Sequence, residues 1–198
     1  MQALPKKLLP LTLFGIAVTS LFSVQPVQAY MVTLEQVGPN VVATGSGPIN
    51  LTGLTFSNAS SANAAIVANL GDVTMTSGNS DVYRGFTGPT NFGSGRIFIP
   101  NSSSGDLVGI IGLDDVIFVP AGYVSGHALS DSMTFNNATF ASLGVTPGTY
   151  KWRWGTNGAN QFFRLVIGPN TVPDGGSTVS LLGFALLGLA ALRRRLGC

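Results

Sequence analysis

The chain is poor in the residues that usually carry chemistry. Its 198 residues include one cysteine, Cys198, one histidine, His127, and one glutamate, Glu35. A lone cysteine excludes a disulfide within the chain, and one histidine with one cysteine does not complete a zinc site. Glycosidase chemistry needs two facing carboxylates, and with a single glutamate at least one of them would have to be an aspartate. We therefore predict a protein that is not an enzyme and that binds no cofactor and no metal.

Two arrangements of the remaining polar residues stay open as alternatives. His127 with Asp115 or Asp131 and a nearby serine would make a hydrolytic triad, although no Gly-x-Ser-x-Gly motif is present. Asp114 and Asp115, with Asp106 or Asp131, would offer oxygen ligands to calcium, although no Asp-x-Asp-x-Asp loop is present. Neither arrangement has the motif that would normally identify it.

Charge is also scarce, since only 9% of the residues are charged. The whole chain has a net charge of +2, but five of its ten basic residues lie near the two ends. Between residues 30 and 171, five basic and seven acidic residues leave a net charge of −2. This part of the chain lacks the basic surface that nucleic acid requires, so nucleic acid is excluded as a partner.

Long hydrophobic runs occur only at the two ends of the chain. At the N-terminus, Lys6 and Lys7 precede an apolar run over residues 8–22, and Val27-Gln28-Ala29 follows it. A basic segment, an apolar segment and small residues at the end of the region are typical of a secretory signal peptide. We predict that residues 1–29 are this signal peptide, and that signal peptidase cleaves after Ala29.

The C-terminal run is preceded by a turn-forming motif and followed by positive charge. The motif is Val172-Pro173-Asp174-Gly175-Gly176, the apolar run covers residues 179–192, and the chain continues with Arg193-Arg194-Arg195. Proline, aspartate and glycine favour a turn and interrupt a helix. Fourteen apolar residues rise about 21 Å as a helix, short of the roughly 30 Å hydrocarbon core. The segment is therefore predicted to be a marginal transmembrane helix with an arginine-rich cytoplasmic stop.

This three-part tail, residues 172–198, resembles the PEP-CTERM class of C-terminal sorting domains, with Pro173-Asp174-Gly175 in place of Pro-Glu-Pro. The resemblance implies an exosortase as processing enzyme, in a Gram-negative bacterium that makes exopolysaccharide. It also implies a transient inner-membrane precursor and a product at the cell surface or in the extracellular, biofilm-forming matrix. An ordinary C-terminal membrane anchor is the alternative interpretation.

Residues 30–171 are predicted to form one extracytoplasmic all-β domain. Helix signals are nearly absent, and turn residues recur every eight to twelve positions. The pattern predicts an antiparallel β-sandwich, jelly-roll-like in connectivity. Its eleven expected strands are residues 32–37, 41–45, 49–56, 64–69, 73–76, 96–99, 107–111, 116–119, 132–135, 150–155 and 162–167.

Aromatic residues offer the remaining functional alternative. In residues 150–154, Tyr-Lys-Trp-Arg-Trp, strict alternation places the three aromatic rings on one face of a strand. Such a face normally packs into the core. The alternative is a platform on which sugar rings of the exopolysaccharide stack, drawn from Tyr83, Phe86, Phe92, Tyr123, Trp152 and Trp154.

Overall fold

The structure is a computed structural model that describes residues 29–155 and 161–168. Within this part of the chain, one 3-10 helix, η1 (Ala68–Leu70), accompanies thirteen β-strands. The strands are β1 (Ala29–Val37), β2 (Asn40–Pro48), β3 (Thr55–Ala62), β4 (Ala65–Val67), β5 (Asp72–Thr74), β6 (Gly78–Arg84), β7 (Ile97–Phe98), β8 (Ser102–Gly105), β9 (Gly109–Ile111), β10 (Val116–Pro120), β11 (Ala128–Phe135), β12 (Gly148–Trp154) and β13 (Gln161–Ile167).

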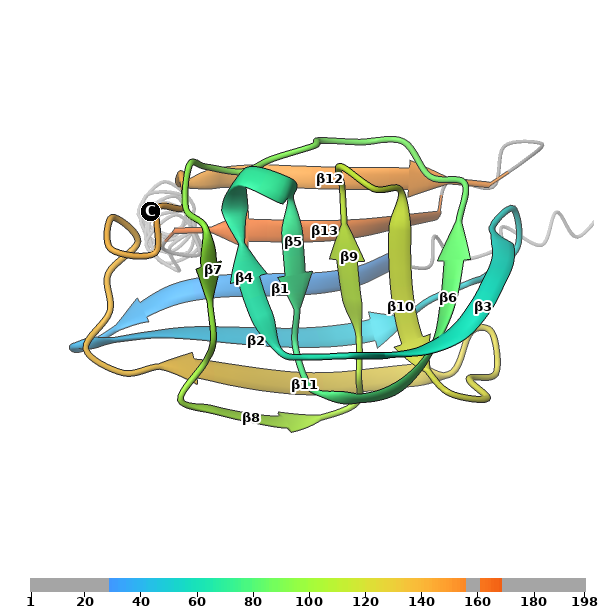
Figure 1. Ribbon diagram of the computed structural model, residues 1–198, viewed down its shortest axis with the longest axis horizontal. Coiled ribbons are helices and arrows are strands. Elements are labelled where there is room, and N and C mark those ends of the chain that lie inside the picture. Colours follow the sequence, from blue (N-terminus) through green and yellow to red (C-terminus); the bar gives the residue numbers. More distant parts are fainter. Residues whose placement is uncertain (1–28, 156–160, 169–198) are drawn as a thin grey trace, which may run out of the picture.

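The strands form two sheets that pack face to face. Sheet A has the order β12-β13-β1-β2-β11-β8, and sheet B has the order β3-β6-β10-β9-β5-β4-β7. The strands of one sheet run across those of the other (Figure 1), which is the orthogonal way of stacking two sheets. The predicted all-β sandwich is confirmed, while its jelly-roll-like connectivity stays a prediction. The expected flanking helices lie outside the described residues, among which no helix is long and apolar enough to cross a membrane.

One strand pair corrects the prediction of a wholly antiparallel fold. The first strand, β1, runs parallel to the last strand, β13, with Ala29 opposite Phe162 and Leu34 opposite Ile167. Both strands belong to hairpins, since β1 pairs antiparallel with β2 and β12 pairs antiparallel with β13. The parallel contact joins the two hairpins. Alternation marks each strand locally but does not encode its direction relative to a strand far away in the sequence, so this pairing was missed.

Two strands were not predicted from the sequence, and a third was predicted over only two of its residues. β3 overlaps the expected strand 49–56 at two residues, while β6 and β8 were not expected. β3 and β8 are edge strands in which nearly every side chain is exposed. An edge strand without a buried face shows no apolar alternation, so serine- and asparagine-rich segments of this kind read as loops.

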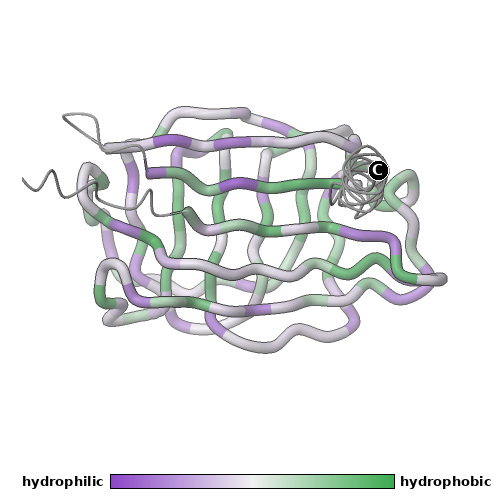
Figure 2. Tube along the Cα trace, turned by 180° about the vertical axis from the view of Figure 1, so that it is seen from behind, coloured by the Kyte–Doolittle hydropathy of each residue, from purple (hydrophilic) through white to green (hydrophobic). Residues whose placement is uncertain are grey.

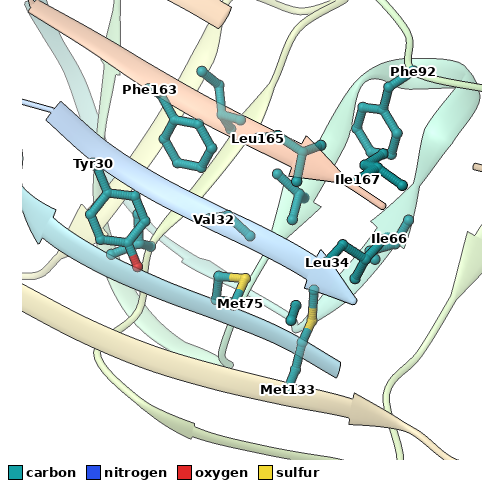
Figure 3. Packing of buried hydrophobic residues seen from close by; sticks show 14 of the residues in the cluster. Tyr30, Val32, Leu34, Ile66, Met75, Phe92, Met133, Phe163, Leu165 and Ile167 are labelled. Atoms are coloured by element: carbon teal, nitrogen blue, oxygen red, sulfur yellow. The ribbon is translucent and has the colours of Figure 1, made fainter. Parts of the chain in front are cut away.

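The core fills the space between the two sheets. Along β13, Phe163, Leu165 and Ile167 are buried and alternate with half-buried residues; on β1, Tyr30 and Val32 face the same core. Figure 3 shows these side chains converging on one another between the layers. Burial alternates in the same way along most of β1, and Figure 2 shows hydrophilic positions along the strands of sheet A seen from behind. This is the pattern of a sheet with one buried and one solvated face.

Candidate functional site

The predicted signal-peptidase site, Ala29, is the first residue of β1. Tyr30, which would begin the mature chain, has no exposed surface. Its hydroxyl donates a hydrogen bond to the buried carboxyl group of Asp131 on β11. The predicted cleavage point therefore coincides with the beginning of the first described strand. Residues 1–28 lie outside the described part of the chain.

The predicted sorting residues, Val172 to Gly176, and the predicted stop, Arg193 to Arg195, also lie outside the described residues. The last described strand before them in the sequence is β13, an internal strand of sheet A. Gly168 directly follows that strand, and its amide donates to the Leu34 carbonyl across a 3.0 Å N···O distance. The described domain thus ends close to the sorting segment in sequence.

Both tryptophans belong to the core, which corrects the simplest version of the carbohydrate platform. Trp152 has no exposed surface and Trp154 is 6% exposed. Their indole N–H groups donate to the carbonyls of Pro89 and Asn50, each across 2.7 Å. The rings therefore have no free face for a sugar. The inward orientation of this face was predicted from the alternation of residues 150–154.

The other predicted aromatic residues are also largely engaged. Phe86 and Phe92 are buried. The Tyr123 hydroxyl donates to the His127 carbonyl at 2.6 Å and accepts the Ile49 amide at 3.0 Å, so this side chain ties loops together. Tyr83 is half-buried and lies on β6. Of the six predicted aromatic residues, Tyr83 keeps part of its ring accessible, although the ring also packs against the core.

Tyr83 instead has an aromatic partner that the sequence did not single out. Phe56 on β3 is 54% exposed and lies edge-to-face with Tyr83, with ring centroids 5.5 Å apart. The two residues are directly opposite each other in the β3–β6 register. A single phenylalanine in a serine-rich segment carries no periodic signal, which is why Phe56 was overlooked.

The residues considered for a hydrolytic triad have other partners. His127 is exposed, and its backbone amide and carbonyl take part in the loop contacts with Val124 and Tyr123. The Asp115 carboxylate accepts the backbone amide that follows β6 at 3.0 Å, and Asp131 is bound to Tyr30. The structure therefore gives each aspartate a structural partner rather than bringing it to the histidine.

The calcium hypothesis required several carboxylates to converge. The Asp106 carboxylate accepts the Ser130 amide at 2.8 Å, and that of Asp115 binds backbone amides elsewhere. Among residues 29–155 and 161–168, no group of three or more histidine, cysteine, aspartate or glutamate side chains is close enough to hold a metal ion. The described carboxylates thus do not form the cluster that the calcium hypothesis required.

Two buried aspartates have unusual acid–base properties. Burial, reinforced by the charge of Asp106, raises the pKa of Asp131 to about 7, although the hydrogen bond from Tyr30 opposes this shift. Burial also raises the pKa of Asp72 to about 7, with the Thr74 hydroxyl opposing it from 2.9 Å. Burial and the neighbouring Asp131 carboxyl raise the pKa of Tyr30 above its ordinary value. A carboxyl group in an apolar interior resists ionisation because its charged form loses hydration.

A shallow groove of about 400 Å³ lies beside the edge strands β7 and β8. It is lined by residues 63–65, Ser77, Ile97 and residues 99–103. The lining contains neither a charged nor an aromatic side chain. It therefore offers neither the acid–base groups of a catalytic site nor the flat rings of a sugar-stacking site.

Comparison with known proteins identifies the tail. Residues 171–196 match the family model described as the VPDSG-CTERM motif, which is a C-terminal sorting signal of the PEP-CTERM kind. Gly175 stands where the motif's name has serine. No curated protein and no solved structure matches the chain. The predicted recognition of residues 172–198 as a sorting tail is confirmed, and the chain carries the signal of proteins exported to the cell envelope or surface.

Proposed function

We propose that this protein is a non-catalytic component of the cell surface or extracellular matrix, delivered there by exosortase processing of its tail. The observation that carries the proposal is the sorting motif at residues 171–196. In the proposed pathway, signal peptidase removes residues 1–29, and the apolar run 179–192 holds the precursor in the inner membrane of a Gram-negative cell. An exosortase then cuts at or close to residues 172–176, and the β-sandwich reaches the surface or an exopolysaccharide-rich biofilm.

The absence of catalysis is part of the proposal. It is supported by the hydrogen bonds of the aspartates considered for a hydrolytic triad. The Asp131 carboxyl group accepts a hydrogen bond from Tyr30, and the Asp115 carboxylate accepts hydrogen bonds from backbone amides. In a non-catalytic surface protein, polar side chains of this kind would stabilise the fold.

The test compares two paired alanine variants in the producing cells. Pro173→Ala with Asp174→Ala removes the turn chemistry of the motif. The control, Pro169→Ala with Asn170→Ala, makes a similar change immediately outside the matched segment. We expect the motif variant to remain in the inner membrane with its tail attached, while the control is processed as the parent is.

Intact-mass measurement of the protein in the exported and membrane fractions determines where signal peptidase and the exosortase cleave. The proposal is wrong if the Pro173/Asp174 variant is trimmed and released as efficiently as the parent, because the tail is then only an anchor. Removal of Arg193 to Arg195 is expected to weaken the cytoplasmic stop and to let uncleaved precursor escape.

A second candidate function, carbohydrate binding, is favoured by the exposed Phe56 beside Tyr83. Exposed aromatic rings bind the apolar faces of sugars, and Phe56 offers such a ring on edge strand β3, while Tyr83 beside it packs partly against the core. The test is affinity electrophoresis of the exported protein in exopolysaccharide from the producing strain. Phe56→Ala is expected to abolish the retardation, while Leu113→Ala, at an apolar side chain with the same 54% exposure, leaves it unchanged. Equal migration with and without the polysaccharide would rule this function out.

A further inference from the structure

One edge and both faces of strand β3 are largely uncovered. This strand is the terminal strand of sheet B and pairs with β6 from Thr55 to Ala62. Among the described residues, no strand lies along its other edge (Figure 1). Seven of its eight side chains are exposed and the eighth is half-buried, so sheet A covers neither face of this strand to any large extent. A strand held by one neighbour alone leaves a row of backbone donors and acceptors facing outward.

This edge lacks most of the usual features that discourage pairing. Its sequence, Thr-Phe-Ser-Asn-Ala-Ser-Ser-Ala, contains neither a charged residue nor a proline. One register irregularity lies between Phe56 and Asn58, and the pairing is regular from Asn58 to Ala62. Natural sheets normally protect edges with lysines, prolines, bulges or very short strands. Here the bulge is confined to one end, and residues 58–62 form a regular stretch in which alternate residues turn their backbone N–H and C=O groups toward the open edge.

The other sheet edges differ from β3. The backbone of Arg153 on β12 exchanges hydrogen bonds with that of Thr87, at 2.8 and 2.9 Å, and Lys151 and Arg153 add positive charge. Edge strand β7 has two residues, and edge strand β8 has four. The β3 edge is therefore the longest that is both uncovered and uncharged in the described domain.

We propose that β3 pairs antiparallel with β3 of a second copy of this chain, which joins the two B sheets into one continuous sheet. The two edges are identical, so a two-fold axis makes the contact self-complementary and closes it at a dimer. Neutrality matters because two like-charged edges would repel each other. Beyond Phe56 the side chains are serine, asparagine and alanine, which are small enough for two strands to approach at ordinary sheet spacing. This inference is independent of how the tail is processed.

The test uses the exported protein purified from the producing cells, examined by sedimentation equilibrium over a range of concentrations. The parent is expected to show a reversible monomer–dimer equilibrium. Ala59→Lys with Ser61→Lys places four like charges around the two-fold axis and is expected to raise the dimer Kd by about tenfold or more. Ala59 lies opposite Asp81 on β6, so the lysine has a favourable neighbour within the monomer.

A matched control separates this effect from a general effect of charge. Ser46→Lys with Ala128→Lys adds the same charge at exposed positions of β2 and β11, which are internal strands of sheet A. This control is expected to dimerise as the parent does. A parent that stays monomeric, a control that loses the dimer equally, or assemblies that persist unchanged in the Ala59/Ser61 variant would each overturn the proposal.

Hydrogen exchange gives a second measurement that does not depend on a variant. In the dimer, outward-facing amides of residues 58–62 become hydrogen-bonded, so their exchange is expected to slow as the protein concentration rises. Amides of β8, the other serine-rich edge, serve as the internal reference and are expected to exchange at a constant rate. Exchange of residues 58–62 that is independent of concentration would contradict the β3 contact even if a dimer formed.

Discussion

Lowering the pH from 7 to 5 is expected to stabilise the domain, because two of its buried aspartates are protonated in the folded state. Asp131 and Asp72 both have a pKa of about 7 in the fold, against an ordinary value of 3.8. Between these two values the folded chain binds more protons than the unfolded chain. Stability is then full below pH 3.8 and is lost progressively as the pH rises toward 7.

The size of the effect follows from this linkage. With a pKa of 3.8 unfolded and about 7 folded, each carboxyl lowers the free energy of unfolding by about 2 kcal/mol between pH 5 and pH 7. If the two groups act independently, the domain loses about 4 kcal/mol over this range. A typical domain has a total stability of about 5–15 kcal/mol, so a change of this size is readily measured.

The assay is urea unfolding of the exported protein at pH 5, 6 and 7, with Asp131→Asn as the diagnostic variant. Asparagine keeps an oxygen that accepts the Tyr30 hydroxyl proton, but it does not ionise. We expect the loss between pH 5 and pH 7 to fall from about 4 to about 2 kcal/mol in this variant. A parent whose stability is constant or rises over this range, or an Asp131→Asn variant with the slope of the parent, would refute the reasoning.

Three substitutions test other buried contacts and hydrogen bonds of the domain, each by urea unfolding at constant pH. Trp152→Ala is expected to cost about 3–5 kcal/mol because the ring is fully buried, whereas Arg153→Ala, on the exposed face of the same strand, should change stability by about 0.5 kcal/mol or less. Gly45→Ala is expected to cost about 1–3 kcal/mol, because a Cβ at this position would overlap the Asp131 carboxyl. Asp115→Ala is expected to cost about 1–3 kcal/mol, since it leaves the two backbone amides that follow β6 without their acceptor. An Asp115→Ala variant as stable as the parent would show that water replaces the carboxylate.

The sequence predicted best the strands that have one buried face. β12 alternates in both sequence and burial, and β1, β2 and β13 were expected at nearly their observed positions. The polar strand β3 could not be predicted in the same way, because its residues are exposed on both faces and lack a period. Strand direction was also hidden, since the parallel contact of β1 with β13 depends on which hairpins meet in space.

Among the candidate functional residues, those of the tail could be predicted from the sequence, and the buried aspartates could not. The tail was recognisable because its motif, apolar run and arginines follow one another in sequence. The properties of Asp131 and Asp72 were not predictable, because an isolated aspartate in a polar sequence gives no sign of burial. The sequence allows Asp131 to be a catalytic or calcium-binding residue, whereas its position beside Tyr30 makes it part of the core.

The order of strands in sheet A connects the two ends of the domain. β1 begins at Ala29 and lies between β2 and β13, so one of its two neighbouring strands is the last strand of the described domain. Until β13 is available, β1 has an open edge, and the partly formed core would lack Phe163 and Leu165. β13 ends at Ile167, and the matched sorting segment begins at residue 171. Sheet A can therefore be completed only when nearly all of the chain before the sorting segment is present, which places the last step of folding next to the point where the tail begins.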